Sequence, residues 1–87
     1  MSPRWAEVAG HTLWFYYREE HQRPHVAVRG EHHATIDLNT LEILAGGLPP
    51  NVYRAVRRFL AHHRDEAFAA WEASRRGEPP GTIPGGR

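Results

Sequence analysis

The chain has 87 residues, with 11 basic and 10 acidic side chains, and every basic one is an arginine. This length accommodates one small domain, and the absence of cysteine excludes disulfides, thiolate metal ligands and a cysteine nucleophile. A small domain without disulfides fits a reducing compartment, and no apolar run approaches the roughly 18 residues of a membrane span, so we expect a cytoplasmic protein with no membrane partner.

The first half of the chain has the pattern of an antiparallel sheet. Residues 2–7 show no clear period and are expected to form an irregular arm. Three runs rich in β-formers, each followed by turn residues such as Gly, Pro or Asn, predict strands. They cover residues 12–18, 25–29 and 34–38, and a short fourth strand is predicted at residues 42–44.

The period changes after Gly47, where Pro49 and Pro50 suit the first turn of a helix. Apolar residues then recur at helical spacing, so that they share one face. The members of this face are Val52, Val56, Phe59, Leu60, His63, Ala67, Ala70 and Trp71. We therefore predict one amphipathic helix over about residues 50–76, stopped by Gly77, with residues 63–66 as the place where it would break if there were two helices.

These patterns predict an α+β fold: a small antiparallel sheet of three to four strands followed by one long amphipathic C-terminal helix that covers one sheet face. Residues 1–77 are expected to form this single domain. Residues 78–87 are rich in Pro and Gly and are expected to form a mostly extended or disordered tail, in which Ile83 could dock. Val56, Phe59 and Trp71 of this helix are expected to be buried.

Two histidines, His21 and His25, bracket a loop shaped by Pro24. Unperturbed imidazole titrates near pH 6.5, so a pair of histidines can supply the base and the acid that metal-free RNA cleavage requires. We assign both as candidate catalytic residues. Candidate phosphate contacts nearby are Arg18, Arg23 and Arg29.

The alternatives for this loop stay open. His21 is otherwise a solvated loop residue, and His25 a strand-end residue bonded to the backbone. A metal site that adds Glu19 and Glu20 is the weaker interpretation, because the spacing is loose and no third ligand is required. We expect no bound metal and no cofactor.

The predicted helix presents arginines on the side opposite its apolar face. They are Arg54, Arg57, Arg58, Arg64, Arg75 and Arg76. Such a face is usually solvated, but it also suits contact with phosphates or with an acidic partner, and we assign Arg54, Arg57 and Arg58 as candidate contacts. His62 and His63 are expected to point in different directions, with His63 partly buried and hydrogen-bonded.

The order of these motifs resembles the small bacterial family catalogued as domain of unknown function 4160. The matching residues are Glu20, His21, Pro24 and His25; Ala34 and Ile36; Gly47, Leu48 and Pro49; and His63, Arg64, Glu66 and Trp71. The tail "GEPPGTIP" is also similar, so the resemblance runs from about residue 14 to residue 84. Two positions depart from the family signature: Arg23 replaces a proline, and Ala27 replaces a third histidine.

The resemblance implies a bacterial protein that is encoded beside a small cognate partner of the kind catalogued as domain of unknown function 2442. It implies the toxin-like component of a toxin–antitoxin-type module that acts on RNA or translation. A His-dependent, metal-independent ribonuclease is one expectation. The alternative is a non-enzymatic module whose helix and sheet edge bind the partner protein, and Ala27 favours that alternative.

Overall fold

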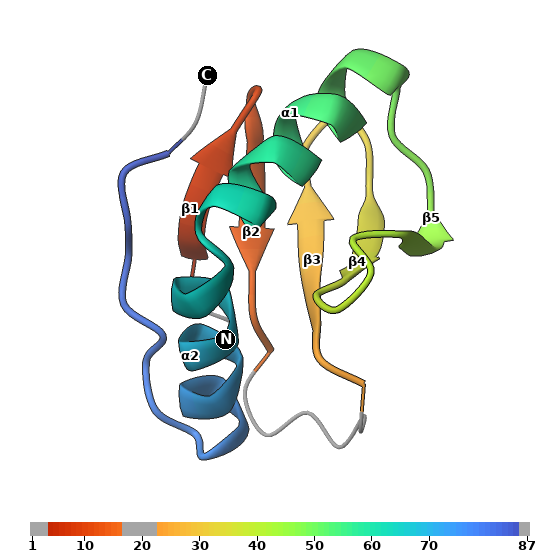
Figure 1. Cartoon of the computed structure of the whole chain (residues 1–87). Helices are drawn as coiled ribbons and strands as arrows, with labels where there is room; N and C mark the ends of the chain where they lie inside the picture. The colour runs from red at the N-terminus through yellow and green to blue at the C-terminus, as the bar shows by residue number, and fades with distance from the viewer. Residues whose placement is uncertain (1–3, 17–22, 86–87) are drawn as a thin grey trace.

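The computed structural model describes residues 4–16 and 23–85, which form a five-stranded antiparallel sheet and two consecutive helices (Figure 1). The elements are β1 (Arg4–Val8), β2 (His11–Trp14), β3 (His25–Arg29), β4 (Ala34–Asp37), β5 (Ile43–Gly46), α1 (Pro50–His62) and α2 (Arg64–Arg75). The strands pair in chain order, each with the next. Within the described ranges, neither helix is long and apolar enough to cross a membrane.

The predicted α+β class is correct, but the prediction of three to four strands and one long helix is wrong. The missing strand is β1, where an irregular arm was expected. A β-bulge between Arg4 and Ala6 interrupts its alternation, so Trp5 and Ala6 are both buried and the sequence shows no period of two. A two-residue turn with positive φ at Ala9 and Gly10 joins β1 to β2, as in tight hairpins.

The single long helix is also wrong, because the helix breaks at His63, where φ is −112° and ψ is 37°. Asp65 and Glu66 lie in the first turn of α2, where acidic side chains favour a new helix start. The apolar face nevertheless continues through the break: α1 buries Val52, Val56, Phe59 and Leu60, and α2 buries Ala67, Ala70, Trp71 and Ser74.

The core lies between the sheet and the helices, and aromatic rings dominate it. Trp5 makes edge-to-face contacts with Phe15 and Phe59, at centroid distances of 5.3 and 5.8 Å. The predicted burial of Val56, Phe59 and Trp71 is confirmed. The helix α1 therefore has a well-fixed position over the sheet, and its opposite side faces solvent.

The segment after Gly77 returns along the outer side of β1 (Figure 1). The backbone N–H of Ile83 donates to the carbonyl oxygen of Trp5 at 3.1 Å, and the Ile83 side chain packs against the core. Gly85 lies so close to Glu7 that an added Cβ would fall 2.0 Å from the Glu7 carbonyl oxygen. The tail thus covers the β1 edge of the sheet, whereas β5 forms the other edge.

Candidate functional site

Of the two histidines that the sequence singled out, the structure describes only His25; His21 and Arg18 lie outside the described residues. His25 opens β3 and is 8% exposed. Its Nδ1–H donates to the carbonyl oxygen of Arg23 at 2.9 Å, and its ring lies 4.9 Å from that of Trp71. This imidazole therefore helps to pack α2 against the sheet, and a catalytic role for His21 and His25 stays a prediction.

Arg23 and Arg29, two of the predicted phosphate contacts, have partners within the chain. The Arg23 guanidinium lies 3.5 Å from the buried Asp37 carboxylate, which also accepts hydrogen bonds from the backbone N–H groups of Asn39 and Thr40. The Arg29 guanidinium donates to the Tyr16 hydroxyl and lies over its ring.

His25 and Arg29 are at opposite ends of β3. At about 3.3 Å per residue, their backbones are about 13 Å apart. The described residues of the predicted site do not converge on one pocket.

The break at His63 divides the six arginines of the predicted helix into two groups. Those after the break have partners within the chain. Arg64 donates to the Asn39 carbonyl oxygen at 2.6 Å, Arg75 pairs with Glu72 at 3.4 Å, and Arg76 pairs with Glu78 at 3.0 Å.

Arg54, Arg57 and Arg58 on α1 are exposed, and among residues 4–16 and 23–85 none of their guanidinium groups has a hydrogen bond or an ion pair. The helix α1 contains no acidic residue, so their charge is uncompensated along its length.

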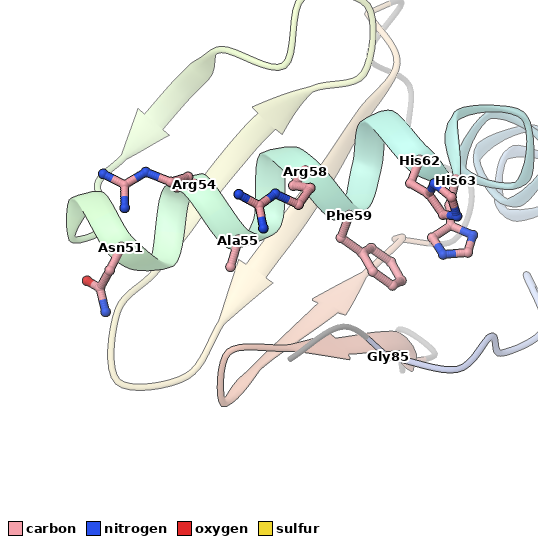
Figure 2. A pocket seen from close by; sticks show the side chains of 8 residues that line it. All are labelled: Asn51, Arg54, Ala55, Arg58, Phe59, His62, His63 and Gly85. Atoms are coloured by element: carbon pink, nitrogen blue, oxygen red, sulfur yellow. The ribbon is translucent and has the colours of Figure 1, made fainter.

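Two of these arginines line a cavity of about 510 Å³ that lies beside α1, between the helix and Gly85 of the tail (Figure 2). Its walls are Asn51, Arg54, Ala55, Arg58, Phe59, His62, His63 and Gly85. Arg54, Arg58 and His62 are spaced four residues apart, which places them on one side of the helix. Arg57 lies outside this row and does not line the cavity.

His62 and His63 lie next to each other at the end of α1 (Figure 2), with ring centroids 4.9 Å apart and ring planes at 86°. His63 also contacts the Phe59 ring, at 4.5 Å. Its Nδ1 lies 3.0 Å from Glu66 Oε2 and, because a carboxylate only accepts hydrogen bonds, Nδ1 carries the proton. The pair with Glu66 fixes the orientation of the ring and leaves Nε2 to act as an acceptor when the imidazole is neutral.

This pair was not predicted from the sequence, because neighbouring residues of a continuous helix point about 100° apart. The predicted partial burial and hydrogen bond of His63 are correct, since its side chain is 23% exposed and bonded to Glu66. The sequence signal that identifies the site is the row of Arg54, Arg58 and His62 that ends at the helix break. Within the described part of the chain, no three His, Asp or Glu side chains are grouped so that they could hold a metal ion.

Comparisons with known proteins identify the family but no characterised relative. No curated protein and no solved structure matches the chain. The family model described as Domain of unknown function (DUF4160) matches residues 10–72. The match includes strands β2–β5, all of α1 and most of α2, and it leaves β1 and the tail outside. The matched range covers most of the chain, which therefore belongs to this family.

Proposed function

We propose that the chain binds single-stranded RNA in the cavity between α1 and the tail. The observation that carries the proposal is the row of Arg54, Arg58 and His62 along one cavity, in a helix without acidic residues. Guanidinium groups bind phosphate oxygens as bidentate forks, and those of Arg54 and Arg58 have no ion pair to break among the described residues. The cavity is lined by the nitrogen-bearing side chains of two arginines and two histidines, which favours an anionic ligand such as the phosphate groups of a nucleic acid strand.

The spacing of the two arginines supports contact with successive phosphates of one strand. Four residues along an α-helix correspond to a rise of about 6 Å. This separation allows Arg54 and Arg58 to hold neighbouring phosphates of an extended strand, with His62 next in the row. Phe59 is buried, and the small part of it that borders the same cavity adds apolar surface for contact with a base or sugar.

The binding experiment compares Arg58→Ala with Arg57→Ala by fluorescence anisotropy, using a 5′-labelled single-stranded RNA of 12 nucleotides. Both side chains are exposed on α1, but only Arg58 lines the cavity, so Arg57→Ala is a matched control for loss of one charge. Loss of a charge-assisted contact to phosphate in Arg58→Ala should weaken binding by about tenfold or more. Arg57→Ala should change the Kd much less.

Salt dependence provides a second readout. For single strands the slope of log K against log salt is about −0.7 per phosphate contact, so two arginines give about −1.4 and Arg58→Ala gives about −0.7. Equal losses of RNA affinity in the two variants would mean that binding depends on the overall positive charge of α1, and would contradict binding in the cavity. Binding of polyglutamate as tightly as RNA would point to an acidic protein as the ligand.

The toxin-like role that the resemblance implies is part of this proposal. A protein that binds RNA through α1 is expected to act on RNA or translation when it is produced without a partner. Expression of the wild-type chain alone should arrest growth, and expression of Arg54→Ala/Arg58→Ala should not. Growth arrest by both proteins, expressed at equal levels, would show that toxicity does not depend on the arginines of the cavity.

A second candidate function is protein binding at the β5 edge, and it is favoured by the exposure of this strand. Leu44 is the exposed large hydrophobic residue of the described part of the chain, at 41% exposure, and it lies on the edge that the tail does not cover. Unpaired backbone groups of an edge strand accept a further strand. We expect co-expression with the small neighbouring protein to give a stable complex that Leu44→Lys weakens, with Glu42→Lys as the charge control. An unchanged complex would argue against this edge.

A further inference from the structure

We propose that His62 and His63 form a catalytic pair that cleaves RNA by metal-independent transesterification. This inference rests on the proposed binding of RNA by α1, and it adds a reaction and a different pair of histidines from the one that the sequence suggested. The ribose 2′-hydroxyl supplies the nucleophile, so the substrate class is RNA and not DNA.

The geometry at the helix break carries this assignment. Both imidazoles line the cavity that contains Arg54 and Arg58, and their centroids are 4.9 Å apart. Each is accessible: His62 is exposed, and His63 keeps 23% of its side chain exposed. Two imidazoles that contact one another, beside two guanidinium groups without a partner in the described part of the chain, can act on one phosphodiester.

Glu66 distinguishes the roles of the two rings. Its carboxylate accepts the Nδ1–H of His63 at 3.0 Å and stabilises the positive charge that forms when Nε2 takes a proton. We therefore assign His63 as the base, His62 as the acid and Glu66 as a positioning residue. Phe59 contacts the His63 ring, with the centroids 4.5 Å apart and the ring planes at 42°, and restricts its rotation.

The reaction balances without a further reactant. Neutral His63 Nε2 removes the proton of the 2′-hydroxyl, and the 2′-oxygen forms a bond to the adjacent phosphorus. The bond from phosphorus to the 5′-oxygen breaks, and that oxygen takes a proton from protonated His62. The products are a 2′,3′-cyclic phosphate and a 5′-hydroxyl end, and the Arg58 guanidinium balances the charge that develops on the non-bridging oxygens.

The test uses the full-length chain and a labelled single-stranded RNA in the presence of a chelator. A matched strand with 2′-O-methyl ribose serves as a substrate that binds but lacks the nucleophile. Loss of one general acid or base typically lowers the rate by 10²–10⁴-fold, so His62→Ala and His63→Gln should each lose at least about 100-fold in kcat. His33→Ala, which changes an exposed histidine outside the cavity, should keep the wild-type rate.

Glu66 requires a readout that separates positioning from folding. Glu66→Gln should lower kcat with little change in KM, and Glu66→Asp should recover part of the rate, because a carboxylate again faces Nδ1. Thermal melting of each variant checks that the fold is retained. Equal rates for Glu66→Gln and wild type would refute the positioning role.

The outcomes distinguish this inference from the proposed function. Binding without cleavage by the wild-type chain would overturn the catalytic pair and leave RNA binding in place. Failure to bind RNA would overturn both. Cleavage that persists in His62→Ala and His63→Gln but disappears in His21→Ala would assign the chemistry to His21 and not to the cavity. Cyclic phosphate ends, identified by mass spectrometry, together with loss of cleavage in the cavity variants, support the proposal.

Discussion

Replacement of Phe59 by alanine tests how strongly α1 is held over the sheet, since Phe59 joins the core to the cavity. Its side chain is 7% exposed, contacts Trp5 at a centroid distance of 5.8 Å and also contacts His63. Removal of a buried phenylalanine ring typically costs about 3–5 kcal/mol. One side of this ring borders an open cavity, so water can enter the space and the cost should lie near about 3 kcal/mol.

This loss is large for a domain of this size. Each kcal/mol shifts the Tm of a 60–100-residue domain by roughly 4–8 °C, so Phe59→Ala should lower Tm by about 12–24 °C. Urea unfolding followed by tryptophan fluorescence gives the free energy directly. Phe68→Ala is the matched control, because Phe68 packs against the core from a half-buried position and should cost less.

The result that refutes this reasoning is a loss below about 1 kcal/mol in Phe59→Ala, or a larger loss in Phe68→Ala. Either result would mean that α1 does not rest on the Trp5–Phe59 contact. The cavity, whose walls come from α1 and the tail, would then lack a rigid support.

Three further predictions concern stability and composition. Gly46→Ala should be strongly destabilising in thermal melts, because Gly46 has φ of +76° and an added Cβ would lie 2.3 Å from the His33 carbonyl oxygen. In the control Gly47→Ala, the added Cβ meets nothing within 4 Å and the change should be tolerated. Equal Tm values for the two variants would contradict this prediction. Asp37→Ala should cost about 1–3 kcal/mol in urea unfolding because it removes the buried acceptor of two backbone N–H groups. Arg23→Ala should cost less than about 1 kcal/mol, because the Arg23 side chain is 63% exposed, and the reverse order would refute the argument. Elemental analysis of protein purified without a polyhistidine tag should find no stoichiometric zinc or nickel, and near-stoichiometric metal would show that the expectation is wrong.

The sequence by itself determined the α+β class and the central part of the core. Runs of β-formers located β2, β3, β4 and β5 to within a few residues, because local alternation and turn residues dictate strands of this kind. Helical spacing identified Val56, Phe59 and Trp71 as buried, since the apolar face must turn toward the sheet wherever the helix axis lies. The basic side of α1 followed from the same period.

Other features required the tertiary structure. The strand β1 was missed because its bulge buries Trp5 and Ala6 in succession, and the sheet and the tail hold it in place. The tail's contact with β1 joins segments about 80 residues apart in the sequence, a distance over which no local pattern gives information.

The candidate site itself depends on the helix break. Leu60 and Ala67 lie seven positions apart across His63, a spacing that fits one helix or two, so the periodicity did not distinguish them. Only the folded chain decides that Arg64 reaches the Asn39 carbonyl oxygen, 25 residues earlier, while Arg54 and Arg58 find no partner in the described residues. The physical reason is that the amino-acid pattern specifies which side of a helix is polar, but the direction in which each helix packs decides which polar groups meet.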